Sequence, residues 1–167
     1  GGCFWCVESD FEHLDGVIEA VSGYTGGHTK DPSYKDTSAG GTGHAEAVRV
    51  EYDASRITYE QLLDAFWRSI DPTVANRQFC DQGSQYRSGI FVSDARQRLA
   101  AEASLRELER TKPFDSEIYT EIEDATTFYE AEEYHQDYAK KNPIRYNLYR
   151  RGCGRDRRLQ EIWGNEE

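Results

Sequence analysis

Segments of helical periodicity alternate with segments of strand periodicity along this chain, and this alternation limits its possible folds more than any other feature. Apolar residues recur every three or four positions in segments that predict helices at residues 3–14, 58–71, 94–110 and 130–142. Alternating or β-branched runs predict strands at residues 17–27, 44–52, 86–92 and 117–123. We therefore expect an α+β fold, a mixed β-sheet sandwich with flanking helices, ferredoxin-like in arrangement.

The remaining stretches lack a clear period. Residues 25–43 and 71–86 are interpreted as loops, and because loops of that length in a compact domain usually carry function, we expect both to border the active site. Residues 143–167 begin with a proline that stops the preceding helix, and we expect an irregular C-terminal tail that wraps over the site. The length fits one domain spanning residues 1–167.

Composition narrows the classes of partner. A net charge of −11 argues against nucleic acid, because phosphate binding requires clustered Lys and Arg. No apolar run is long enough to span a membrane, and no signal-peptide pattern is present. Four cysteines, at positions 3, 6, 80 and 153, are too few and too unevenly spaced for a secreted disulfide framework. We expect a monomer in the reducing cytoplasm.

Cys3 is the candidate nucleophile. It lies in the first turn of the first predicted helix, where unpaired backbone N–H groups and the positive end of the helix dipole stabilise a thiolate and lower its pKa. The alternative is a small buried apolar residue, the usual role of an isolated cysteine. The two preceding glycines and a second cysteine at Cys6 favour the reactive thiol.

Glu46 is the candidate general acid. In the predicted strand at residues 44–52 it shares a face with Val48 and Val50, because side chains of a strand alternate between its two faces. Apolar surroundings raise the pKa of a carboxyl group, which suits it to donate a proton near neutral pH. The alternative is a glutamate at the strand end that reaches solvent.

Several other residues are candidates for substrate binding. Phe4 and Trp5 are either core residues or the wall of a small apolar pocket beside the thiol, suited to a methyl group or a thioether. The two long loops carry tyrosine hydroxyls that can donate to a substrate oxygen. The polar candidates are Tyr34, Tyr86, Asp81 and His135.

Eight stretches of the chain together resemble one family. In order they are GCFWC, GYTGG, DPSY, TGHAEAVRVEYD, FWRSIDPT, DQGSQYRSGIF, FYEAEEYHQDY and KNP. They are similar to segments of the type A peptide-methionine sulfoxide reductases and extend from Gly2 to Pro143. The resemblance implies reduction of the S epimer of methionine sulfoxide, free or in proteins, on an α+β fold with no metal and no bound organic cofactor.

The resemblance also implies a role for each candidate. Cys3 matches the nucleophile that attacks the sulfoxide sulfur, and Glu46 matches the acid that protonates the departing oxygen with help from Tyr34 and Tyr86. Methionine leaves, Cys3 becomes a sulfenic acid, and a second cysteine converts it to a disulfide that an external thiol donor, expected to be thioredoxin, reduces. The remaining matches are Phe4 and Trp5 for the methyl pocket, and Asp81 with both tyrosines for the polar substrate shell.

The sequence departs from the family pattern at the cysteine that resolves the sulfenic acid. Many members carry glycine where this chain has Cys6, and a resolving cysteine where it has Asn147. Cys6 is one helical turn from Cys3, whereas Cys153 lies in a glycine-flanked tail that can swing in, and Cys80 adjoins Asp81. We favour Cys6 over Cys153, and both over Cys80, because closing a short loop costs least, although a helix can hold such a pair slightly too far apart.

Three other functions compete with this interpretation. A thioredoxin-like disulfide oxidoreductase also needs a CxxC at a helix start, but leaves the substrate-like loops unexplained. A structural zinc protein would use all four cysteines, although one CxxC and two isolated cysteines make poor ligand spacing. A peptide-binding module would need only the pocket, and turnover would exclude it.

Overall fold

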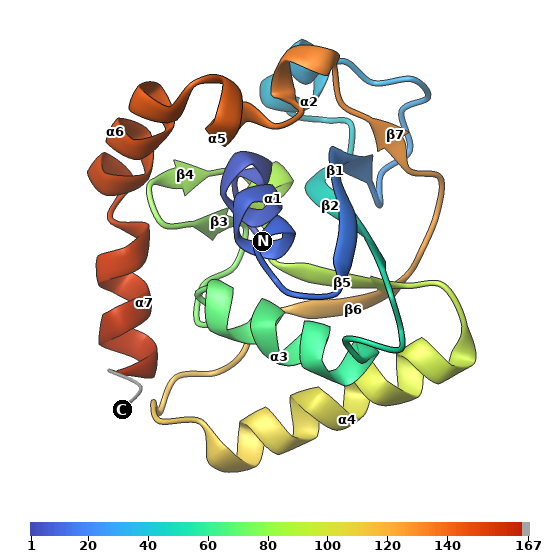
Figure 1. Ribbon diagram of the computed structural model, residues 1–167, viewed down its shortest axis with the longest axis vertical. Coiled ribbons are helices and arrows are strands. Elements are labelled where there is room, and N and C mark those ends of the chain that lie inside the picture. Colours follow the sequence, from blue (N-terminus) through green and yellow to red (C-terminus); the bar gives the residue numbers. More distant parts are fainter. Residues whose placement is uncertain (165–167) are drawn as a thin grey trace.

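The computed structural model describes residues 1–164, in which helices surround one three-stranded sheet and two two-stranded sheets (Figure 1). The α-helices are α1 (Phe4–Glu12), α2 (Tyr34–Ala39), α3 (Tyr59–Ser69), α4 (Ala95–Thr111), α5 (Tyr138–Lys141), α6 (Pro143–Cys153) and α7 (Arg155–Trp163). Two short 3₁₀ helices are η1 (Ser84–Tyr86) and η2 (Glu133–His135). No helix within residues 1–164 has the length and apolar character needed to cross a lipid bilayer.

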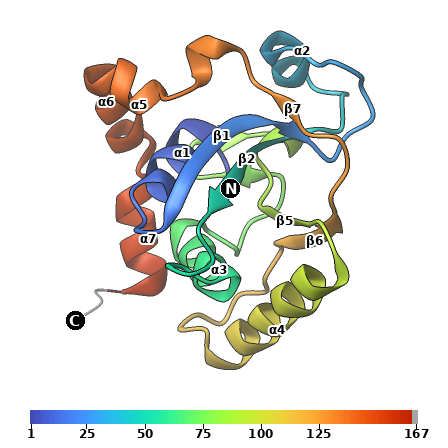
Figure 2. The same cartoon turned by 45° about the vertical axis from the view of Figure 1, so that its right-hand side comes forward.

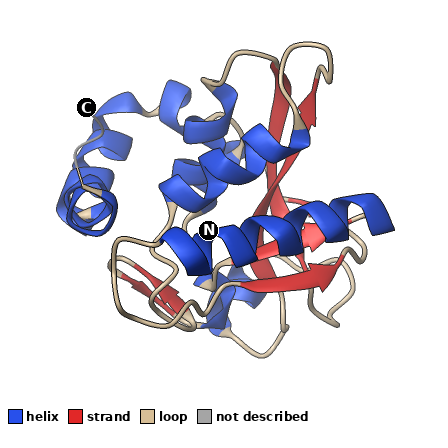
Figure 3. Ribbon diagram, turned by 90° about the horizontal axis from the view of Figure 1, so that it is seen from below, coloured by secondary structure: helices blue, strands red, loops and turns tan. Residues whose placement is uncertain are grey.

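The strands form separate small sheets (Figure 3). They are β1 (Val17–Thr25), β2 (Ala45–Tyr52), β3 (Arg77–Gln78), β4 (Asp81–Gln82), β5 (Gly89–Val92), β6 (Glu121–Asp124) and β7 (Tyr129–Glu130). Antiparallel pairing joins β2, β1 and β7 in that order and joins β3 to β4, whereas β5 and β6 pair in parallel. The α+β class is therefore confirmed, while the finer expectation of a ferredoxin-like sandwich is not.

Two apolar clusters fix the helices on these strands. One places Val7 and Phe11 of α1 against Ala20 of β1 and Leu62 of α3, so the first helix is anchored at its buried face. Figure 2 shows α1 lying beside β1. The other joins α3, α4 and β5 through a cluster of six buried residues, Leu63, Trp67, Ile70, Ile90, Val92 and Ala101. Because α1 is packed on β1 and β2, its N-terminal end has a fixed position relative to the strands.

The C-terminal segment is the main correction to the predicted fold. Residues 143–163 are not irregular: they form α6 and α7, which run along one side of the molecule (Figure 1). Pro143, taken above only as a stop signal, occupies the first turn of α6, where its missing N–H costs nothing. The helical period was hidden because the aliphatic side chains of α6 face solvent, Ile144 being 77% and Leu148 66% exposed, while its buried positions are tyrosines.

The two long loops contain short elements that the sequence did not indicate. Residues 25–43 include α2, whose N-cap Ser33 and Asp36 form a reciprocal capping box. Residues 71–86 include the β3–β4 hairpin and η1. The helix expected at residues 130–142 is divided into η2 and α5, because Asp137 adopts a left-handed conformation between them (φ 54°).

Candidate active site

The N-terminus of α1 presents Cys3. This residue is the N-cap, and its carbonyl accepts hydrogen bonds from the backbone N–H groups of Cys6 (3.1 Å) and Val7 (3.3 Å). Gly2 precedes it with φ 82°, and a Cβ atom on Gly2 would lie 2.7 Å from the Cβ of Gln78. Glycine at this position therefore allows the chain to pass close to β3 and turn into the helix.

Glu46 reaches the same point from β2. Its Oε1 accepts a hydrogen bond from the backbone N–H of Phe4 at 3.1 Å, so the carboxyl group lies at the end of α1 beside Cys3. The side chain is buried, with 3% of the residue exposed, which excludes the alternative of a glutamate reaching solvent. Burial raises the pKa of Glu46 to about 8, although the Phe4 hydrogen bond opposes this. The carboxyl group therefore carries a proton at neutral pH.

The thiols of Cys3 and Cys6 are both free and buried, and they belong to one packed cluster. Burial raises the pKa of Cys3, contrary to the lowering expected from its helix position, whereas the hydrogen bond from Cys3 lowers the pKa of Cys6 to about 7. The reason is that the end of α1 is covered: Tyr146 and Tyr149 of α6 pack against the two cysteines. Desolvation of the thiolate outweighs the helix dipole at Cys3.

The adjacent aromatic residues have different surroundings. Phe4 is 1% exposed and packs against Tyr24 and His135, with ring centroids 5.7 Å and 5.0 Å away. Trp5 is only partly buried, stacks on Tyr138 at 3.7 Å, and donates its indole N–H to Nδ1 of His135 at 2.9 Å. Trp5 thus presents a fixed aromatic surface near the thiols and packs against the buried cluster that contains Phe4.

Both long loops border this region, as the sequence predicts. Tyr34 begins α2 and Tyr86 ends η1, and each phenol is close enough to Glu46 for the charge of that carboxyl group to raise its pKa. Burial raises the pKa of both phenols, and the charge of Glu46 acts in the same direction. Two neutral hydroxyl donors therefore converge near the carboxyl group.

Asp81 connects the site to α6. It lies in β4, and one of its carboxylate oxygens accepts a hydrogen bond from the hydroxyl group of Tyr149. Burial raises the pKa of Asp81, and its charge contributes to the raised pKa of Glu46. Sequence reasoning missed Tyr149 because it lies in the segment expected to be irregular. Its spacing with Tyr146 and Cys153, three and four residues, could have marked one face of a helix.

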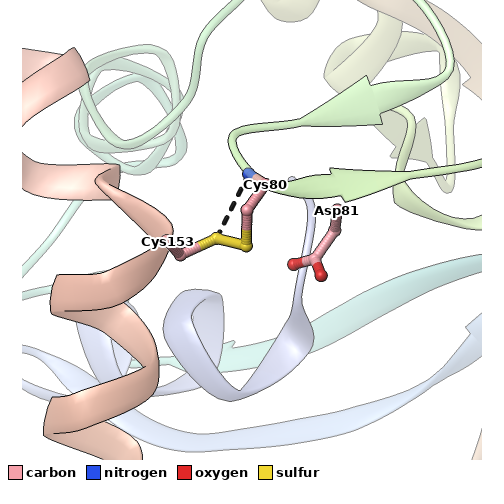
Figure 4. A group of neighbouring side chains, drawn as sticks. All are labelled: Cys80, Asp81 and Cys153. Carbon is pink, nitrogen blue, oxygen red and sulfur yellow. Dashed lines mark hydrogen bonds between the residues drawn. A yellow bond between two sulfur atoms is a disulfide. The ribbon is translucent and has the colours of Figure 1, made fainter.

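The other two cysteines form a disulfide. Cys80 and Cys153 are bonded to each other with Cα atoms 4.9 Å apart, and Figure 4 shows Asp81 beside them. Cys153 therefore does not lie on a free tail but ends α6, where the bond attaches it to the β3–β4 hairpin. This link between residues 73 positions apart was not anticipated from the sequence.

The arrangement of the cysteines also disfavours a single zinc site. Among residues 1–164, two groups of side chains are close enough to hold a metal ion: Cys80 with Asp81 and Cys153, and Glu8 with Glu12 and Asp137. Neither group includes Cys3 or Cys6, and the sulfur atoms of the first are bonded to each other. The four cysteines therefore do not gather around one point, as a four-cysteine zinc site requires.

Comparison with known proteins decides the family. The family described as "Peptide methionine sulfoxide reductase" matches residues 1–167. The chain belongs to this family. It is 48% identical over 164 residues to peptide methionine sulfoxide reductase MsrA 2 of Caulobacter vibrioides, covering 98% of this chain and 83% of that protein. It is 47% identical over 164 residues to MsrA of Bacillus subtilis, covering 98% and 93%.

Solved structures of the reductase Mxr1 have a fold similar to that of this chain. Mxr1 of Saccharomyces cerevisiae in reduced form is 39% identical, with a TM-score of 0.77 over 86% of this chain and 82% of Mxr1. Mxr1 in complex with Trx2 is 30% identical, with a TM-score of 0.55 over 83% and 79%. A whole-chain match to these reductases leaves no support for a thioredoxin-like oxidoreductase.

Proposed function

We propose that this chain reduces the S epimer of methionine sulfoxide, free or in proteins, to methionine. The observation that carries the proposal is the meeting of the Cys3 thiol with the buried carboxyl group of Glu46 at the start of α1. A nucleophilic sulfur and a protonated acid at one point are what sulfoxide reduction requires. Membership of the methionine sulfoxide reductase family supplies the substrate class.

The first step joins Cys3 to the substrate. The Cys3 thiolate attacks the sulfoxide sulfur, and Glu46 donates its proton to the sulfoxide oxygen. Tyr34 and Tyr86 donate hydrogen bonds to the same oxygen, which their shared position near Glu46 supports. The oxygen, now a hydroxyl group, passes to the Cys3 sulfur as two bonds break: the sulfur–oxygen bond of the substrate and the new bond between the Cys3 sulfur and the substrate sulfur. Methionine is released, and Cys3 is left as a sulfenic acid.

The substrate methyl group lies against aromatic rings in this proposal. Trp5 is partly exposed and fixed by the Tyr138 stack and the His135 hydrogen bond, which makes it the surface available to the methyl group. Phe4 supports it from the core. Asp81 belongs to the polar side of the site through its position next to Tyr149.

Recycling uses a second thiol. The Cys6 thiol attacks the sulfenic sulfur of Cys3, water leaves, and a Cys3–Cys6 disulfide forms. The shared buried cluster of these two free thiols supports Cys6 as the resolving residue, and Cys153, which is bonded to Cys80, is the second candidate. An external dithiol then reduces the disulfide. The complex of the related Mxr1 with Trx2 supports thioredoxin as that donor.

The chain acts as a single domain over residues 1–167 and as a monomer in the cytoplasm. Its chemistry needs no metal and no organic cofactor, because sulfur carries out both the attack and the recycling.

One experiment tests reaction and stereochemistry together. The protein is incubated with a racemic methionine sulfoxide peptide and dithiothreitol, and the remaining epimers are resolved by chromatography. We expect the S epimer to be consumed and the R epimer to persist. The control variant is Cys3→Ser, in which a hydroxyl group replaces the nucleophile, and residual activity above about a tenth of wild type would overturn the role of Cys3.

A further inference from the structure

The proposed chemistry needs a group that removes the thiol proton of Cys3. Cys3 is buried, with 7% of the residue exposed, so solvent does not reach it freely. Glu46 cannot accept this proton, because burial raises the pKa of Glu46 to about 8 and its carboxyl group is already protonated at neutral pH. Cys6 can take this proton only after losing its own, so an acceptor that serves the two thiols must lie on another element that touches them.

Tyr149 is that contact. Its side chain packs against the cluster that contains Cys3 and Cys6, and its hydroxyl group donates a hydrogen bond to a carboxylate oxygen of Asp81. A phenol can relay a proton, because its oxygen accepts one hydrogen bond while its proton is donated to another group. The Tyr149 hydroxyl group is therefore the group through which a proton from Cys3 can reach the Asp81 carboxylate.

The disulfide holds the two ends of this chain together. Cys80 directly precedes Asp81, and Cys153 lies one helical turn after Tyr149, with its Sγ 3.9 Å from the Tyr149 oxygen. The backbone N–H of Cys80 also donates to Sγ of Cys153 at 3.2 Å. Figure 4 shows the Asp81 carboxyl group next to this crosslink. The link thus joins the two segments that carry Asp81 and Tyr149.

We propose that Tyr149 and Asp81 form a proton-transfer path that deprotonates Cys3, and that the Cys80–Cys153 disulfide keeps this path assembled. The Cys3 thiol gives its proton to the Tyr149 oxygen as the Tyr149 hydroxyl proton passes to Asp81. The products are a Cys3 thiolate, a neutral Tyr149 that now donates to the sulfur, and a protonated Asp81. The proposal rests on the proposed function, because it explains how the attacking thiolate arises.

The surrounding charges agree with this direction of transfer. Burial raises the pKa of Asp81, which brings its carboxylate closer in basicity to a thiolate. The guanidinium group of Arg155, at the start of α7, opposes that rise and favours an ionised Asp81 before the transfer. Cys3 itself is faced by Cys6 on the same helix, by Glu46 from β2 and by Tyr149 from α6.

The test measures alkylation of Cys3 by iodoacetamide as a function of pH, with each cysteine quantified by peptide mapping. The protein is used with its Cys80–Cys153 disulfide intact, as verified by non-reducing mapping. We expect Tyr149→Phe and Asp81→Asn each to lower the Cys3 rate at neutral pH about tenfold and to move the midpoint of the pH profile upward. The double variant should be no slower than Tyr149→Phe alone, because both remove the same path.

A matched control variant distinguishes loss of the proton-transfer path from a change in packing around Cys3. Tyr146→Phe removes another hydroxyl group of α6, which contacts Arg150 at 2.9 Å, and should leave the pH profile of Cys3 in place. An unchanged Cys3 profile in Tyr149→Phe would overturn the path. Additive losses in Tyr149→Phe and Asp81→Asn would do the same. Circular dichroism establishes that each variant is folded.

The role of the disulfide is tested with the variant Cys80→Ala, Cys153→Ala. We expect slower alkylation of Cys3 and no further loss when Tyr149→Phe is added. A rate equal to that of wild type would show that the disulfide does not hold the path. Alkylation requires no sulfoxide, so failure of this inference is distinct from failure of the proposed function. The latter would show as absent turnover with an otherwise reactive Cys3.

Discussion

The backbone N–H of Phe4 donates to Glu46 at 3.1 Å, and this hydrogen bond attaches the end of β2 to the first turn of the helix that carries Cys3. The two residues that it joins are 42 positions apart in the sequence. The carboxyl group is therefore held at the nucleophile by the backbone itself. Because the donor is a backbone N–H, a substitution of the Phe4 side chain does not remove it.

Glu46→Gln tests the acid directly. Glutamine keeps an oxygen that accepts from Phe4 but has no acidic proton, so we expect sulfoxide reduction at neutral pH to fall by roughly two to four orders of magnitude. The loss should shrink at lower pH, where the medium supplies protons. In wild type the acid step should weaken as pH rises through about 8, where Glu46 ionises. Single-turnover methionine release across this range measures it, and a small loss independent of pH would mean that Glu46 is structural.

The same substitution should change how stability depends on pH. The pKa of Glu46 is about 8 in the folded protein against 4.5 ordinarily, so between these values the folded state holds a proton that the unfolded state has lost. The free energy of unfolding contributed by this site therefore falls as pH rises, with a slope of up to about 1.4 kcal/mol per pH unit. Glu46→Gln should lack this decline and gain stability relative to wild type between pH 5 and 8.

Urea denaturation at several pH values checks this expectation. Both proteins share the other titrating groups, so the difference between their unfolding free energies isolates the site. Parallel curves for variant and wild type would contradict a raised pKa at Glu46.

The parts of the fold that the sequence predicted are those with strong periodic patterns. Helices α1, α3 and α4 and strands β1 and β2 carry apolar residues at the positions that their packing uses, so their existence could be inferred locally. The nucleophile and acid could also be inferred, because one depends on a helix start and the other on strand alternation. Both features are encoded within a few residues.

The parts that could not be predicted depend on the C-terminal helices. Tyr149 reaches Cys3 and Asp81 only because α6 folds back over α1, and nothing local to Tyr149 indicates that contact. The same covering helix desolvates Cys3 and reverses the expected direction of its pKa shift. The disulfide joins segments with no common pattern, so only the tertiary structure reveals it.

Trp5→Ala should chiefly weaken substrate capture. The indole ring is held by the Tyr138 stack and the His135 hydrogen bond, so its removal opens the aromatic surface rather than the core. We expect KM for a methionine sulfoxide peptide to rise about tenfold, with a smaller change in kcat. Trp5→Phe, which retains a ring, should recover part of the loss. An unchanged KM in a variant that is folded by circular dichroism would identify Trp5 as a packing residue.

The Cys80–Cys153 disulfide should contribute measurably to stability. It closes a loop of 73 residues, and the loss of chain entropy in the unfolded state corresponds to about 4 kcal/mol. We expect the variant Cys80→Ala, Cys153→Ala to unfold at lower urea concentration than wild type when no reductant is present. With excess dithiothreitol the two proteins should approach each other, which serves as the control. Equal midpoints without reductant would contradict a stabilising crosslink.

The choice of resolving cysteine separates two chemical steps. The sulfenic acid on Cys3 forms before any disulfide, so replacing the resolving residue should leave one stoichiometric release of methionine intact while stopping thioredoxin-dependent cycling. We expect Cys6→Ser to show this behaviour, since Cys6 is a free thiol in the same buried cluster as Cys3. The trapped sulfenic acid should be detected as a dimedone adduct on Cys3 by mass spectrometry.

Cys153→Ser tests the second candidate for the resolving cysteine. Because Cys153 is already bonded to Cys80 at the end of α6, its replacement should still allow a Cys3–Cys6 disulfide to form, which peptide mapping after one turnover detects. Cycling should then continue with thioredoxin, at a rate reduced only by the loss of the crosslink. If Cys153→Ser stops cycling while Cys6→Ser sustains it, the end of α6 must release Cys153 during turnover. In that case the proximity of Cys6 to Cys3 is a consequence of packing alone.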